Sequence, residues 1–240
     1  MVITKEQVLG QIVSDDYRAA AVFKDFGIDF CCNGNRSIEE ACNQANINCD
    51  KVLGTLNAAL QERSKGAIDY ASWPLDLLAD YIEKNHHRYV RKKIEEITPY
   101  LNKIMKVHGD RHPELLNIQE LFAESASDLT SHMYKEEQVL FPYIRSLVEQ
   151  GEAVNKPHFG TVKNPISMMH HEHNIEGERF RKIAQLSNQY TPPVDACGTY
   201  KVTFALLKEF EEDLHLHIHL ENNILFPAAI ALEANLKPNN

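Results

Sequence analysis

The sequence predicts an all-α protein in which a small helical domain precedes a four-helix bundle. Apolar residues recur at helical spacing through four long segments after residue 73, whereas no useful length of chain alternates with a period of two. At 240 residues the chain is long enough for a well-packed core. We therefore predict a helical N-terminal domain over residues 1–65 and a bundle over residues 70–236, with a linker at Ser64–Asp69.

Capping patterns place the helices of the N-terminal domain. Thr4-Lys-Glu-Gln7 and Ser37-Ile-Glu-Glu40 both fit the capping box that begins a helix. The segment Asp29-Phe-Cys-Cys-Asn-Gly34 between them ends in Asn-Gly, which favours a turn. Asp50 is suited to cap a third helix that runs to Leu60.

The bundle helices are expected over residues 75–106, 113–148, 165–188 and 195–234, with loops at 151–163 and 190–195. Pro113 suits the first turn of the second helix. Pro99 is expected to kink or divide the first helix. Pro142 and Pro227 should bend or locally break the second and fourth helices.

Composition excludes several classes of partner. The net charge is −9 and no basic block occurs, which argues against nucleic acid and anionic membranes. No apolar run approaches the roughly 20 residues that span a bilayer, and the first residues lack the layout of a signal peptide. We therefore expect a cytoplasmic protein whose five cysteines are thiols rather than disulfides.

One eleven-residue phrase occurs twice, as His132-Met-Tyr-Lys-Glu136-Glu-Gln-Val-Leu-Phe-Pro142 and as His217-Ile-His-Leu-Glu221-Asn-Asn-Ile-Leu-Phe-Pro227. The two copies are offset by 85 residues (217 minus 132). Positions four apart lie on one face of a helix, so each phrase directs an imidazole and a carboxylate the same way. Two such pairs facing each other in a bundle are typical of a transition-metal site.

The apolar stripes of the first two bundle helices select the inward histidines. His86 shares its face with Ile82 and Val90, and we expect it to point to the core. His87 neighbours charged residues, and we expect it to face water. His132 and Glu136 both fall within the apolar stripe of the second helix.

In the third helix the stripe contains His173, although His170 sits close to it and stays a rival. In the fourth helix His217 and Glu221 lie on the apolar stripe, and His215 and His219 fall to its flanks. Each predicted hairpin thus supplies a lone histidine followed by a His-x-x-x-Glu pair.

Four imidazoles and two carboxylates on inward faces need a compensating charge. A single inward histidine is more often a hydrogen-bonded core residue, but burying two carboxylates costs several kcal/mol each unless a cation pairs with them. Neither Arg nor Lys occupies the neighbouring inner positions. Zinc more often takes four ligands, and calcium and magnesium prefer oxygen. Mixed nitrogen and oxygen ligands suit a pair of iron ions, with manganese as the competitor.

These phrases resemble the hemerythrin-like domain. Together with Asp29-Phe-Cys-Cys-Asn-Gly34, Ser131-His-Met-Tyr-Lys-Glu-Glu137, Glu172-His173 and Leu220-Glu-Asn-Asn223, the chain is similar to the repair-of-iron-centres (ScdA/YtfE-type) family over nearly its whole length. The resemblance implies a non-haem di-iron centre with an oxo or hydroxo bridge, and it favours His173 over His170. Its implied ligands are His86, His132, Glu136, His173, His217 and Glu221, with the two glutamates as bridges.

The resemblance also implies a cytoplasmic stress protein, a homodimer in some members, whose clients are iron–sulfur proteins damaged by nitric oxide or peroxide. Iron donation is the leading expectation. A nitric oxide reductase and a sensor that binds O2 or NO are the alternatives, so an enzymatic role stays open. The vicinal Cys31 and Cys32 match the family's cysteine pair, for which a redox or NO-related role and a purely structural role are both open. We expect Cys42, Cys49 and Cys197 to be structural.

Overall fold

The computed structural model describes residues 3–60, 68–151 and 157–236. Over these residues the regular structure is helical, and the single β-bridge is an isolated one between Val8 and Ser37. The predicted all-α fold class is confirmed. No helix in the described part of the chain is long and apolar enough to cross a membrane.

The chain divides into two compact units, one of residues 79–217 and the other of residues 1–78 with 218–240. Most of the predicted linker lies outside the described residues, so the boundary expected between 65 and 70 stays a prediction. Residues 152–156 of the predicted loop at 151–163 also lie outside them.

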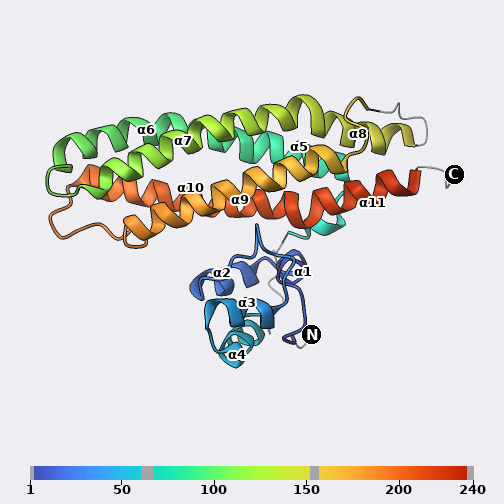
Figure 1. Ribbon diagram of the computed structural model, residues 1–240, viewed down its shortest axis with the longest axis horizontal. Coiled ribbons are helices and arrows are strands. Elements are labelled where there is room, and N and C mark those ends of the chain that lie inside the picture. The colour runs from blue at the N-terminus through green and yellow to red at the C-terminus, as the bar shows by residue number, and fades with distance from the viewer. Residues whose placement is uncertain (1–2, 61–67, 152–156, 237–240) are drawn as a thin grey trace. The chain divides into compact units, whose positions relative to one another are not determined.

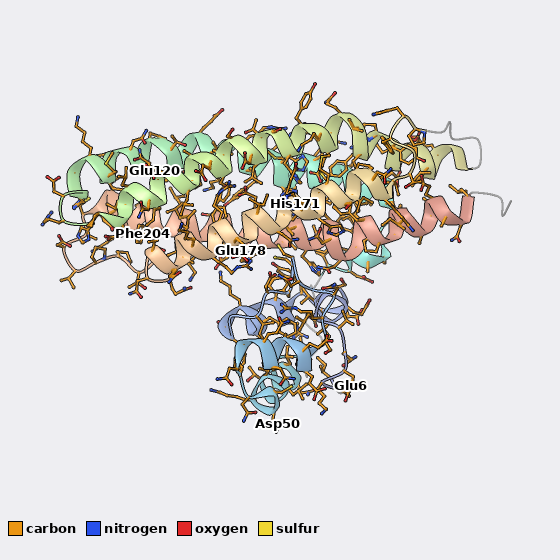
Figure 2. The ribbon with its side chains drawn as sticks, viewed as in Figure 1. Glu6, Asp50, Glu120, His171, Glu178 and Phe204 are labelled. Atoms are coloured by element: carbon orange, nitrogen blue, oxygen red, sulfur yellow. The ribbon has the colours of Figure 1, made fainter. Side chains whose placement is uncertain are left out.

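The unit of residues 79–217 is a bundle in which long helices lie side by side (Figure 1). Phe210 packs edge-on against Phe122 at 5.5 Å and stacks on Phe180 at 5.4 Å between ring centroids, which joins three of these helices. Among the residues labelled in Figure 2, Phe204 is buried in the bundle, whereas Glu120, His171 and Glu178 are exposed on its surface. Its elements are η2 (Ile82–His87), α6 (Arg88–His108), α7 (Glu114–Lys135), η3 (Glu136–Leu140), α8 (Phe141–Gln150), α9 (Lys163–Leu186) and α10 (Gly198–Leu220, to His217).

The other unit contains the N-terminal helices and the end of the chain. Leu9, Phe23, Ile38 and Leu56 are fully buried in it, which gives the N-terminal helices a core of their own. Its elements are α1 (Leu9–Asp15), α2 (Arg18–Asp25), α3 (Ile38–Ala45), α4 (Cys49–Ala59), η1 (Tyr70–Ser72), η5 (Glu221–Leu225) and α11 (Phe226–Leu236), and α5 (Leu75–Tyr81) crosses the boundary between the units.

One of the predicted helix starts in the N-terminal unit, that of α3, is found in the structure. The capping box at Ser37 is confirmed, since its hydroxyl accepts from the Glu40 amide at 3.2 Å and its own amide donates to the Glu40 carboxylate at 2.8 Å. The start predicted at Thr4 is wrong, because α1 begins at Leu9. Asn48 rather than Asp50 caps α4. The short helix α2 had not been predicted.

Prolines shape the bundle helices differently from expectation. Pro99 lies inside α6, which continues through it. Of the two outcomes expected there, the division is wrong and the kink stays a prediction. Pro142 lacks an N–H and its ring crowds the carbonyl of Gln138 four residues earlier. The helix widens there into a π-helical turn over Glu136–Leu140, and α8 follows it. The irregularity expected in the second helix is thus a π-helical turn that begins at Glu136.

Candidate metal centre

The first predicted ligand, His86, is displaced by its neighbour. Both His86 and His87 are buried, at 1% and 0% exposure, so the expectation that His87 faces water is wrong. The cause is the π-helical turn at 82–87, which adds a residue to the turn and advances the inward position by one. His87 approaches Glu136, while His86 bonds through Nδ1 to Asp213 at 3.0 Å and stacks on His217.

The imidazoles of His87 and His132 approach the buried carboxylate of Glu136, and His173 approaches His132. Glu136 is fully buried, and its Oε2 lies 3.4 Å from His87 Nε2 and 3.3 Å from His132 Nε2. His173 Nε2 lies 3.1 Å from His132 Nε2. The structure therefore brings together the predicted residues His132, Glu136 and His173, with His87 in the place expected for His86.

Glu136 belongs to two groups that could each hold a metal ion. His87, Glu136 and His217 present ligand atoms within 4.8 Å of one another, and so do His132, Glu136 and His173. The rings of His87 and His217 are 5.0 Å apart between centroids. One carboxylate is therefore common to two sets of imidazoles, each of which could hold a metal ion.

Outer carboxylates fix which nitrogen of each imidazole faces inward. His87 Nδ1 lies 2.7 Å from Glu137 Oε1, and Arg91 holds that carboxylate through two bonds of 2.8 Å. An ionised carboxylate only accepts hydrogen bonds, so the proton of neutral His87 is on Nδ1 and the Nε2 lone pair points inward. This carboxylate–histidine arrangement is typical of metal sites.

His132 has the same support from the neighbouring helix. Its Nδ1 lies 2.8 Å from Glu172 Oε2, and Lys135 also pairs with Glu172. The hydrogen bond from His132, aided by Lys135, lowers the pKa of the Glu172 carboxyl to about 2. Glu172 is therefore an anion at neutral pH and holds His132 with its Nε2 toward His173. The sequence reasoning missed these outer roles, although Glu137 and Glu172 each adjoin a predicted ligand.

The donor set fits a bound transition-metal ion. His132 presents the lone pair of its Nε2 toward His173 Nε2 at 3.1 Å, and imidazole nitrogens beside the buried Glu136 carboxylate are donors that transition-metal ions bind. His87 Nε2 is buried and makes no hydrogen bond among the described residues. When bound here, iron would supply Lewis-acid and redox chemistry, held by imidazole nitrogen and carboxylate oxygen.

The fourth helical segment carries the remaining predicted ligands. His217 is 1% exposed, and Glu221 is fully buried four residues later, where α10 passes into the π-helical turn η5. The spacing of four puts the two side chains on one side of this continuous helical path. His170 and His215 are half-buried, whereas His219 is buried and bonds through Nδ1 to Asn223 at 3.0 Å.

The vicinal cysteines form a third group of metal-ligating atoms, with Asp29. Asp29 Oδ1 accepts from the amides of Cys31 and Cys32 at 3.1 and 3.0 Å, and the two sulfurs lie 3.7 Å apart as free thiols. The hydrogen bond to Cys32 and burial raise the pKa of the Cys31 thiol well above its usual range. Within the same unit Asn222 donates to the Cys31 carbonyl at 3.1 Å. Cys31 is therefore a neutral thiol at physiological pH.

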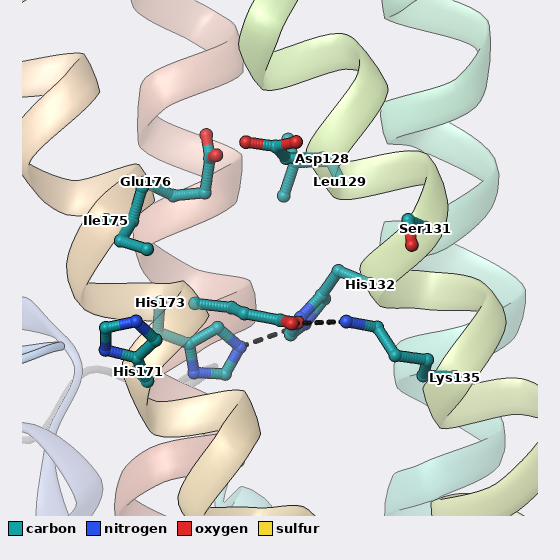
Figure 3. A pocket seen from close by; sticks show the side chains of 10 residues that line it. Asp128, Leu129, Ser131, His132, Lys135, His171, His173, Ile175 and Glu176 are labelled. Atoms are coloured by element: carbon teal, nitrogen blue, oxygen red, sulfur yellow. Dashed lines mark hydrogen bonds and ion pairs between the residues drawn. The ribbon is translucent and has the colours of Figure 1, made fainter.

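A cavity of about 250 Å³ reaches the metal-ligating imidazoles between α7 and α9. Figure 3 shows the rings of His132 and His173 directed toward each other between these helices, and Glu172 pairs with Lys135. Its ten lining residues are Asp128, Leu129, Ser131, His132, Lys135, His171, Glu172, His173, Ile175 and Glu176. Apart from the histidines, three of its charged groups are carboxylates and one is an ammonium.

Buried histidines and a glutamate inside a helical bundle define a cation-binding protein, and the hemerythrin HHE cation-binding domain model matches residues 78–229. The model of the ScdA N-terminal domain of unknown function (DUF542) matches residues 5–60. The iron-sulfur cluster repair protein ScdA of Staphylococcus epidermidis is 33% identical over 93% of this chain and 98% of its own. The iron-sulfur cluster repair protein YtfE of Yersinia pseudotuberculosis is 33% identical over 94% and 97%. The chain belongs to this ScdA/YtfE family.

Proposed function

We propose that this protein carries iron in its bundle and supplies it to iron–sulfur clusters damaged by nitrosative and oxidative stress. The donor set of imidazoles with a buried carboxylate supports iron, and relatives that share most of the chain are named iron-sulfur cluster repair proteins. Its clients are damaged iron–sulfur proteins in the cytoplasm, and it works as a homodimer.

The cavity between α7 and α9 is the observation that carries this proposal. The cavity reaches the imidazoles of His132 and His173, and among its lining residues carboxylates outnumber ammonium groups. Asp128, at the outer part, has a side chain 58% exposed. Arg179 pairs with Asp128 at 2.8 Å and also with Glu176, so the three lining carboxylates face two cations, Lys135 and Arg179. The remaining negative charge lowers the energy of a cation that passes along the cavity and gives no such help to an uncharged diatomic molecule. Release of iron is therefore the use that the lining favours.

The shared position of Glu136 in both ligand groups supports two iron ions per chain. In this proposal Glu136 bridges the ions, and Glu221, one helical turn after His217, is the second bridging carboxylate. The imidazoles are those of His87, His132, His173 and His217. His86 then positions its neighbours through its stacking on His217 rather than binding iron.

The test loads the full-length protein with 57Fe and mixes it with a [4Fe–4S] hydro-lyase whose cluster has been damaged by nitric oxide. We expect 57Fe to appear in the recovered hydro-lyase while this protein loses iron. Asp128→Asn should slow the transfer about threefold without changing the initial iron content, since it removes a charge from the cavity lining. The matched control is Glu120→Gln, an exposed acid on the same helix outside the cavity.

Other outcomes would replace the proposal. Many turnovers of nitric oxide to nitrous oxide with the iron retained would make the protein a nitric oxide reductase. A reversible O2 or NO adduct without turnover or iron loss would make it a sensor. Transfer at equal rates from both variants and the unaltered protein would remove the role given to the cavity.

A further inference from the structure

A second cluster of reactive side chains lies where α6 ends and α10 begins. His108 is 4% exposed, and its Nε2 lies 3.2 Å from the sulfur of Cys197, an exposed cysteine. Arg111 and Asp195 complete the cluster, joined by an ion pair of 2.9 Å. The cluster shares no residue with the metal-ligating groups of the described chain.

The proton on His108 can be placed from its neighbours. Arg111 Nη2 lies 3.4 Å from His108 Nδ1, and a guanidinium can only donate. Nδ1 of the neutral ring is therefore the acceptor, and the proton is on Nε2, which faces Cys197. The sulfur accordingly accepts a hydrogen bond, and such a bond favours the anionic, nucleophilic form of a thiol over its neutral form.

The position of Cys197 at a helix terminus acts in the same direction. Its carbonyl accepts from the Lys201 amide at 3.1 Å, so it directly precedes the first turn of α10, a helix of 23 residues. The positive end of the helix dipole stabilises a negative sulfur there. Asp195 opposes this effect, but its carboxylate is engaged by Arg111 at 2.9 Å and by His112 at 3.0 Å.

We propose that Cys197 is a nucleophilic thiol that reacts with hydroperoxides and other soft electrophiles, with His108 as its positioning residue. The Cys197 thiolate attacks one oxygen of hydrogen peroxide, so that an S–O bond forms as the O–O bond breaks. The sulfur is oxidised by two electrons to sulfenic acid, and peroxide is reduced to hydroxide, which combines with the proton that the thiol released on ionising to give water. This site is separate from the metal centre, and the proposal gives Cys197 a chemical role besides the structural one expected from the sequence.

The experiment measures the alkylation rate of each cysteine by iodoacetamide in the full-length reduced protein, with mass spectrometry to separate the sites. Cys197 should react faster in the folded protein than in concentrated urea, where every thiol has lost its neighbours. Cys49 is the internal control, since it also begins a helix but bonds to another thiol rather than an imidazole. After hydrogen peroxide, dimedone should label Cys197 first.

Two variants separate the imidazole from mere exposure. His108→Gln should slow the alkylation of folded Cys197 on the order of fivefold and leave Cys49 unchanged. Arg111→Gln, at a side chain 62% exposed, should slow it in the same direction without loss of fold, because Nδ1 loses the donor that fixes its tautomer. Overturning results are a folded rate at Cys197 no higher than in urea, or rates unaffected by both substitutions.

Discussion

Replacing His87 with phenylalanine tests the register of the π-helical turn directly. The phenyl ring keeps a flat side chain of similar size where His87 already stacks on Phe141 at 5.6 Å, so the packing is retained. What is lost is the Nε2 atom 3.4 Å from Glu136 Oε2, together with the Nδ1 bond to Glu137 at 2.7 Å. His86→Phe is the matched control one residue away, since its Nε2 belongs to neither ligand group.

The magnitude follows from what each substitution removes. Loss of a group that only orients a ligand costs about 10- to 100-fold in metal affinity. Loss of one of the three atoms that His87, Glu136 and His217 present should exceed that upper value, which corresponds to about 2.7 kcal/mol. His86→Phe should weaken binding by less than about tenfold, because only its stacking on His217 and its bond to Asp213 change.

Anaerobic iron(II) titration against a coloured chelator measures both affinities, and circular dichroism confirms that each variant is folded. The register argued from the π-helical turn would be refuted if His86→Phe lost iron while His87→Phe retained it. Equal losses would refute it as well, because the structure assigns the two rings different roles.

Four further predictions concern single side chains. Glu137→Gln should weaken iron binding about 10- to 100-fold, because the hydrogen bond of His87 Nδ1 at 2.7 Å loses its anionic acceptor. An unchanged chelator titration would show that this bond does not orient the His87 ring. Phe180→Ala should lower the free energy of unfolding by about 3–5 kcal/mol in urea denaturation, and a loss below 1 kcal/mol would contradict its place in the core. Ser37→Ala should cost about 1 kcal/mol through the lost cap of α3 in the same assay, and no change would contradict the capping box. Cys31 should be alkylated more slowly in the folded protein than in urea at pH 8, because its raised pKa keeps the thiol neutral in the folded state. The free energy of unfolding should also fall as the pH rises above about 9, because the thiol ionises in the unfolded chain before it does in the folded one.

The fold class and most of the inner residues could be predicted from helical periodicity. The repeated His-x-x-x-Glu phrase put His132 and Glu136 on one buried face, and the structure places both there. The same repeat contained a sign of the correct first histidine. His173 lies 86 residues after His87 and 87 after His86, and the repeat itself is offset by 85. This one-residue difference favours His87, but the apolar stripe favoured His86, because the stripe assumes an uninterrupted α-helix.

By itself the sequence determined the helical class, the internal repeat and the chemistry of the inner set, because all three depend on residue type and on spacing along one helix. Only the tertiary structure decided the register at His86 and His87, since a π-helical turn is stable when the surrounding packing holds it. The outer pairs were decided in the same way. Glu137 and Glu172 reach their histidines from other helices, 50 and 40 residues away, and no local pattern records a contact across that separation.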